Sequence, residues 1–185
     1  MALQRIVVIG TSGSGKTSLS RELSRRLGIP HIELDALHWG PGWTETPTDV
    51  FRARVSRALE RTAWVVDGNY AKARDIVWPV ADTIVWLDFP LTVVLRQVFL
   101  RTLRRMIVRE ELLHGNREQL RTAVSRDSII LWALRTHGRH RREYTSVLDG
   151  PEYGHLAVVR LRSPQQARLW LSTVPDVRVN AAAVR

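Results

Sequence analysis

Hydrophobic residues occur along the chain in short runs separated by segments of helical periodicity. The runs at residues 5–9, 63–67, 82–90 and 155–161 are rich in Val, Ile and Leu, as expected for strands buried on both faces of a parallel sheet. A further run at residues 31–35 alternates apolar and polar positions and reads as a strand between the first two of these. The alternation of strands and helices predicts an α/β fold, with one parallel sheet between layers of helices.

The helical segments include one long insertion. Between the fourth and fifth runs, residues 100–142 are largely helical in pattern, with a break at residues 113–116 that is flanked by arginines. We expect this stretch to form a helical insertion, or lid, within a single domain of residues 1–175. Residues 176–185 show no clear period and are expected to form a tail.

A glycine-rich loop joins the first strand to the first helix. Residues 10–17 match the phosphate-binding pattern G-x-x-x-x-G-K-[ST] at every fixed position, and Leu19, Leu23 and Leu27 then recur every four residues. In this arrangement, backbone N–H groups and a helix N-terminus converge on phosphate oxygens. The expected nucleotide-binding residues are Gly10, Thr11, Ser12, Gly13, Ser14, Gly15, Lys16, Thr17 and Ser18.

Two residues of this loop carry the expected chemistry. Lys16 would bring a compact positive charge to the β- and γ-phosphates of ATP, and the Thr17 hydroxyl would ligate Mg²⁺. The alternative is a glycine turn with an incidental lysine. The chain has only two lysines, Lys16 and Lys72, and one of them falls on the motif, which favours the phosphate-binding interpretation.

Carboxylates follow three of the predicted strands. Asp67 ends a hydrophobic strand downstream of the loop, which is typical of the second Mg²⁺ ligand; the alternative is a simple turn former. Asp88 ranks second for the Mg²⁺ role, because Phe89 and Pro90 turn the chain away directly after it. Asp35 is placed at the carboxyl end of its strand, the ligand side of a parallel sheet. It would orient or deprotonate an acceptor hydroxyl or help to hold Mg²⁺; the alternative is a helix cap.

The acceptor side is expected to involve residues near these carboxylates. Trp39 and Trp43 can stack on a flat acceptor, or can serve as hydrophobic plugs under a loop. Gly68 permits close approach of a substrate, and Asn69 and Tyr70 follow it directly.

The net charge of +10 comes from arginine, much of it between Arg96 and Arg142. Arg101, Arg105 and Arg117 are candidates to neutralise charge on a transferring phosphoryl group. The alternatives are nucleic-acid binding, a solvated helical hairpin, or a bias of genome composition towards arginine.

The composition excludes disulfide-rich proteins and proteins with thiolate metal sites. A chain of 185 residues without cysteine has no disulfide framework and no thiolate metal site. It shows no apolar stretch long enough for a signal peptide or a membrane span, so we expect a cytoplasmic protein.

Several segments together resemble the nucleoside monophosphate kinase group of P-loop proteins, and more closely the bacterial adenylate-kinase-related proteins known as topology modulation proteins. Besides residues 10–17, these segments are 34–43, 64–70, 82–90, 115–118 and 162–164, so the resemblance extends to about Pro175. It implies a five-stranded parallel sheet in the order 2-3-1-4-5, with ATP and Mg²⁺ as ligands. It also places the donor nucleotide on Gly13, Gly15, Lys16 and Thr17.

The resemblance has one clear departure. Asp67 falls where adenylate kinases have the acid of an Asp-Gly-Phe-Pro-Arg segment, but here Asn69 and Tyr70 follow Gly68, so the Pro-Arg pair that holds the acceptor monophosphate is missing. This argues against AMP as the acceptor. Arg101 lies about where these enzymes carry a lid-hinge arginine.

Two functions fit these observations. The first is a phosphotransferase, monomer or homodimer, that moves the γ-phosphoryl of Mg·ATP to a small acceptor, with nucleoside monophosphates among the candidates. The second is an ATP-dependent regulatory module whose basic segment binds nucleic acid. It predicts an affinity that falls steeply with salt.

Overall fold

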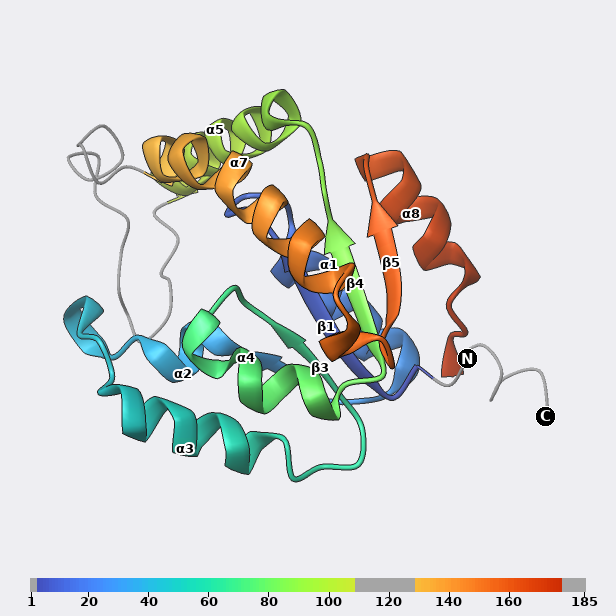
Figure 1. Cartoon of the computed structure of the whole chain (residues 1–185). Helices are drawn as coiled ribbons and strands as arrows, with labels where there is room; N and C mark the ends of the chain where they lie inside the picture. Colours follow the sequence, from blue (N-terminus) through green and yellow to red (C-terminus); the bar gives the residue numbers. More distant parts are fainter. Residues whose placement is uncertain (1–2, 109–128, 178–185) are drawn as a thin grey trace.

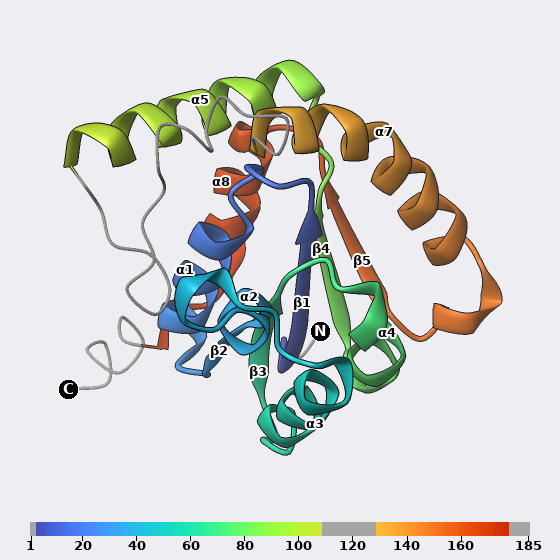
Figure 2. The ribbon, with the colours of Figure 1, turned by 90° about the vertical axis from the view of Figure 1, so that its left-hand side faces the viewer.

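A computed structural model describes residues 3–108 and 129–177 of the chain. Five parallel strands form one sheet in the order β2-β3-β1-β4-β5, so the predicted fold class and strand order are confirmed. Helices cover both faces of the sheet, and α5 and α7 lie across its carboxyl edge (Figures 1 and 2). None of the helices in the described residues combines the length and apolarity needed to span a bilayer.

The strands are short and mostly buried. They are β1 (Arg5–Gly10), β2 (His31–Glu33), β3 (Trp64–Asp67), β4 (Thr83–Leu87) and β5 (Ala157–Leu161). The central strand β1 pairs Val8 with Asp67 on one side and Gly10 with Leu87 on the other. This register places the end of β3 beside the start of the loop that leaves β1.

Side chains along β1 alternate between two hydrophobic layers, as the two-residue period of a strand requires. Val7 and Ile9 face a layer formed with α2 (Leu34–His38), α3 (Thr48–Ala58), α4 (Ala71–Val77) and α7 (Ile129–Leu148). Ile6 and Val8 face a layer formed with α1 (Lys16–Leu27), α5 (Leu91–Val108) and α8 (Pro164–Thr173). The three central strands β1, β3 and β4 are therefore buried on both sides, which explains their continuous apolar runs, whereas Val158 on the edge strand β5 is exposed. The short 3₁₀ helices η1 (Pro41–Trp43), η2 (Trp78–Val80) and η4 (Pro151–Tyr153) complete the described elements.

The structure corrects two local expectations. The second strand ends at Glu33, because Leu34 already begins α2, so Asp35 lies in the first turn of a helix and not on the strand. Residues 139–142, whose run of charged side chains predicts the solvated end of a helix, lie inside α7, which continues to Leu148, and Arg141 forms an ion pair with Asp88. The predicted break at residues 113–116 lies outside the described residues.

Candidate functional site

The loop between β1 and α1 has a backbone that requires glycine. Gly10, Gly13 and Gly15 have φ angles of 150°, 86° and 90°, which side chains rarely tolerate. A Cβ atom on Gly10 would lie 2.8 Å from the carbonyl oxygen of Leu87, and one on Gly13 would lie 2.1 Å from Val98 Cγ2. Gly15 precedes α1 without a side-chain cap, so the first N–H groups of α1 receive no capping side chain from the residue before it. Such a helix start is suited to an anion.

Lys16 folds back over this loop. Its Nζ donates to the carbonyl oxygen of Gly10 at 2.9 Å and of Thr11 at 3.4 Å. Burial lowers the pKa of Lys16, while the nearby charges of Asp35 and Asp67 act to raise it and Arg101 acts to lower it. The structure thus gathers five of the predicted site residues around one ammonium group: Gly10, Thr11, Asp35, Asp67 and Arg101.

Asp67 is a buried carboxylate at the end of β3, only 2% exposed. Its Oδ1 lies 3.5 Å from Nε2 of His31, and its Oδ2 is buried without a hydrogen-bond partner. Burial, and then the charge of Asp67, raises the pKa of the neighbouring Glu33. A buried carboxylate oxygen without a partner is costly, so this position is suited to a cation.

The fold family implies a magnesium ion, and the residues fit one. Asp67 offers its unpartnered Oδ2, and Thr17 offers a hydroxyl in the first turn of α1. Within the described ranges, no three His, Cys, Asp or Glu side chains are arranged to hold a metal ion by themselves. Mg²⁺ usually keeps several waters and is shared with substrate phosphates, so one carboxylate and one hydroxyl from the protein can be enough to hold it.

Asp35 is exposed and held by one neighbour. Its Oδ1 accepts a hydrogen bond of 2.6 Å from the Tyr70 hydroxyl. Burial, followed by the charge of Asp35, raises the pKa of Tyr70, so the phenol stays protonated and remains a donor. The Asp35 carboxylate is thereby oriented by Tyr70.

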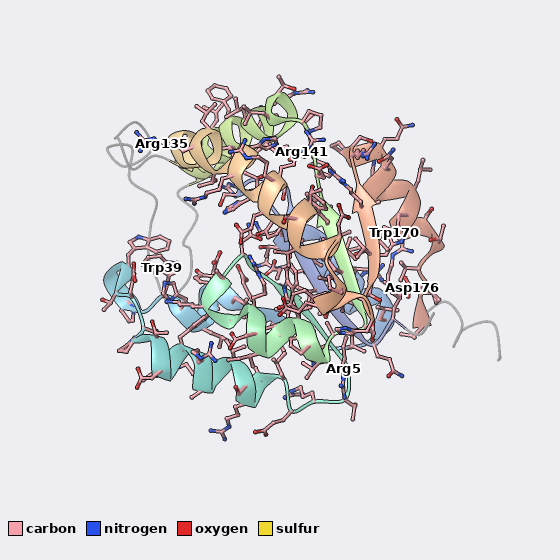
Figure 3. The ribbon with its side chains drawn as sticks, in the orientation of Figure 1. Arg5, Trp39, Arg135, Arg141, Trp170 and Asp176 are labelled. Carbon is pink, nitrogen blue, oxygen red and sulfur yellow. The ribbon has the colours of Figure 1, made fainter. Side chains whose placement is uncertain are left out.

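Trp43 ends η1 and Trp39 lies just before it, in the connection between α2 and α3. Their rings contact edge to face at 5.9 Å, and Trp43 is 43% exposed with a φ angle of 58° (Figure 3 labels Trp39). Trp39 also contacts the buried His38, whose Nδ1 lies 3.3 Å from Nζ of Lys72. The aromatic rim is therefore continuous with a packed cluster under the loop, so the two predicted roles are not mutually exclusive.

Gly68 and Asn69 pack against neighbouring segments. A Cβ atom on Gly68, whose φ is 133°, would lie 2.8 Å from Leu34 Cβ. The Asn69 side chain reaches the loop, where its Oδ1 accepts from Gly10 N–H at 3.3 Å and its Nδ2 donates to the Gly10 carbonyl oxygen. Both polar atoms of its amide therefore contact Gly10, the first residue of the glycine-rich loop that would bind the donor nucleotide.

The candidate lid arginines are only partly within the described structure. Arg101 lies on α5 close enough to Lys16 to influence its pKa. Arg105 is also on α5, but its side chain is outside the described part, and Arg117 lies in the undescribed segment. Their roles remain predictions.

Asp88 has a different environment from Asp67. Its Oδ2 accepts from Nε and Nη2 of Arg160 at 2.9 and 2.8 Å, and its Oδ1 lies 3.2 Å from Nε of Arg141 on α7, above the end of β4 (Figure 3). The guanidinium of Arg160 also stacks on Trp86 at 4.1 Å. With both oxygens engaged by arginines, Asp88 anchors α7 and β5 and is a poor metal ligand.

Replacing Asp88 with alanine should lower the free energy of unfolding by about 2 kcal/mol, because two arginines lose a buried partner; their partial exposure keeps the loss below that of a fully buried pair. Urea unfolding followed by circular dichroism measures this. The matched control is Asp149→Ala, an exposed aspartate, with an expected change within about 0.5 kcal/mol. Equal stabilities of the two variants would contradict the anchoring role.

Helix α7 adds residues that the sequence did not single out. His140 stacks on Tyr144 at 5.7 Å, and the pKa of His140 is lowered mainly by burial, with Lys16 among the charges that contribute. Tyr144 lines a small pocket together with Tyr70, Arg74 and Trp78. Helical periodicity could predict that Tyr144 faces inward, but nothing in the local sequence predicted that α7 passes over the site.

Kinases are found both among proteins of similar sequence and among solved structures of similar fold. No family model matches the chain. A cytidylate kinase from Pyrobaculum aerophilum is 32% identical over 130 residues, covering 58% of this chain and 69% of that protein.

Solved structures of similar fold include shikimate kinases from Bacteroides thetaiotaomicron and Acinetobacter baumannii, both with a TM-score of 0.55, at 13% and 17% identity. They cover 98% of this chain, and it covers 99% and 95% of theirs. A gluconokinase from Sinorhizobium meliloti has a TM-score of 0.51 at 22% identity, with 94% of each chain covered. At these identities the likeness establishes the fold alone.

Proposed function

The chain belongs to the same P-loop kinase family as the cytidylate kinase of Pyrobaculum aerophilum, and from this we propose that it is a phosphotransferase that moves the γ-phosphoryl group of Mg·ATP to a small acceptor. The observation that carries the proposal is the position of Lys16. Its ammonium lies at the glycine loop, held by Gly10 and Thr11, with Asp35 and Asp67 close by.

The donor nucleotide would bind at the loop. The N–H groups of residues 13–18 would hold the β- and γ-phosphates, and Lys16 would leave its two carbonyl partners to contact them. Mg²⁺, held by Thr17 and Asp67, would neutralise charge on the phosphates. Arg101 would add positive charge on the side of α5, and Arg105 and Arg117 are proposed to join it.

The acceptor would lie over the ends of β2 and β3. Asp35, oriented by Tyr70, would position the acceptor, while Trp39 and Trp43 would cover a flat acceptor. Asp35 would take up the proton of an acceptor that attacks through a hydroxyl, whereas a nucleoside monophosphate would attack through a phosphate oxygen that has no proton to give up. Phosphoryl transfer needs mainly alignment and charge stabilisation, so these contacts suffice without a covalent intermediate. Nucleoside monophosphates are the first acceptor class to test, because the relative is a cytidylate kinase.

The test is an ADP-release assay with Mg·ATP against nucleoside monophosphates, nucleosides and small hydroxyl compounds. We expect release that depends on one acceptor class and is absent in Lys16→Ala. Slow release that no acceptor stimulates would overturn the proposal and favour an ATP-dependent regulatory module. Binding of labelled duplex DNA across a salt series would then test the nucleic-acid role directly.

A further inference from the structure

One backbone carbonyl at the start of the donor loop receives two side-chain donors. The carbonyl oxygen of Gly10 accepts from Nζ of Lys16 at 2.9 Å and also from Nδ2 of Asn69. The same Asn69 amide accepts from the N–H of Gly10 at 3.3 Å. A single side chain from the end of β3 thus holds both polar groups of the residue at which β1 becomes the loop.

We propose that Asn69 is a positioning residue for the phosphate-binding loop, which holds Gly10 in place and keeps its carbonyl satisfied when Lys16 turns towards a phosphate. The inference deepens the proposed function and rests on it only in taking ATP as the ligand of the loop. It assigns the amide to the donor side of the site, whereas the sequence favoured the acceptor side.

The physical reason lies in the competition for the Gly10 carbonyl. A lysine that leaves a half-buried carbonyl oxygen without a donor loses part of what it gains at the phosphate. Because Asn69 also donates to that oxygen, the lysine can move without leaving the oxygen unpaired. Asn69 would therefore lower the cost of rearranging Lys16.

The atoms around Gly10 leave little room for its backbone to shift. Its backbone has a φ of 150°, and it lies so close to Leu87 and Ser14 that a Cβ atom would approach each to 2.8 Å. A loop packed this tightly transmits a small shift of Gly10 to the N–H groups that follow. The neighbours of Asn69 contact the rest of the site, since Asp67 lies beside His31 and Tyr70 bonds Asp35.

Two substitutions separate the parts of the amide. Asn69→Ala removes both contacts, while Asn69→Asp keeps an acceptor for the Gly10 N–H but replaces the donor with a carboxylate oxygen facing the carbonyl. Calorimetric titration with Mg²⁺ and a non-hydrolysable ATP analogue measures binding without any acceptor. We expect both variants to raise the Kd by about 10- to 100-fold, with Asn69→Asp at least as weak as Asn69→Ala.

The control is Ser24→Ala, which removes another side-chain bond to the backbone, from Ser24 Oγ to the Ile29 carbonyl at 2.6 Å, at the far end of α1. It should change the Kd by less than about twofold, because α1 keeps its N-terminus in place. Wild-type affinity in both Asn69 variants would overturn the proposal.

A second measurement does not depend on nucleotide binding. Amide hydrogen exchange of the unliganded protein should be about tenfold faster over residues 10–15 in Asn69→Ala than in the wild type. Unchanged exchange there would overturn the positioning role even if the wild-type chain bound no nucleotide. A wild-type chain that bound no nucleotide, with faster exchange in the variant, would contradict the proposed function and leave the role of Asn69 in ordering the loop supported.

Discussion

Replacing Lys16 with alanine is expected to lower kcat/KM for ATP by about 10³-fold, or roughly 4 kcal/mol of transition-state stabilisation. Its ammonium is the cation already at the mouth of the loop, and phosphoryl transfer depends on fixed positive charge near the γ-phosphate. The fold should persist, because the Gly10 carbonyl keeps its hydrogen bond from Asn69. Steady-state kinetics with the acceptor found in the ADP-release assay measures the loss.

Lys72→Ala is the matched control, since Lys72 is the only other lysine of the chain. Its ammonium lies 5.0 Å from the centre of the Phe51 ring and contacts His38, so its loss should affect stability and leave the affinity for the ATP analogue intact. Activity of Lys16→Ala close to the wild-type value would remove the basis of the kinase proposal.

Replacing Asp67 with asparagine is expected to act in opposite directions on activity and stability. Turnover should fall by about 10²- to 10³-fold, because the proposed Mg²⁺ ligand loses its charge. The free energy of unfolding should stay the same or rise by up to about 1 kcal/mol, since a buried carboxylate with an unpartnered oxygen becomes neutral next to Glu33. Thermal unfolding and ADP release at several Mg²⁺ concentrations measure the two effects.

Glu45→Gln provides a comparison for Asp67→Asn, because it neutralises a carboxylate that is largely exposed, 3.9 Å from His38 at the rim. It should leave the Mg²⁺ dependence unchanged. If Asp67→Asn destabilised the protein and kept full turnover, Asp67 would be a structural partner of His31 and not a metal ligand.

Much of the fold could be predicted because burial on both faces leaves a plain signal in the sequence. Strands such as Trp64–Asp67 are continuous apolar runs, and the glycines of the loop mark backbone angles that other residues avoid. The strand order followed from the family resemblance and is confirmed. The boundary at Glu33 was missed because Leu34 and Asp35 suit a strand end and a helix start equally well.

The site was harder to predict, because its decisive contacts join residues far apart in the chain. Asp67 ends one buried strand and Asp88 follows another, so the apolar pattern alone does not separate their roles, and the local sequence separates them only by Phe89 and Pro90. The difference comes from Arg141 and Arg160, which reach Asp88 from two later elements. In the same way, Asn69 looked like a substrate contact beside Gly68, and only the pairing of β3 with β1 brings its amide to Gly10.

The pairing of Asp88 with arginines has a consequence for how a charged ligand would be oriented. At the carboxyl edge, Glu33 of β2 pairs with one arginine, Arg21, at 3.4 Å, and Asp67 of β3 lies 3.5 Å from His31. Asp88, just after β4, pairs with two arginines, Arg141 and Arg160, at 3.2 and 2.8 Å. Among the described residues, carboxylate charge therefore lies at the end of β3, from Asp67, whereas the end of β4 carries one carboxylate and two guanidinium groups, and Arg101 lies on α5. A polyanion entering this field would turn its bare phosphate oxygens to the arginine side and its bound cation to the carboxylate side, so the direction of entry is selected before any base or acceptor group is recognised.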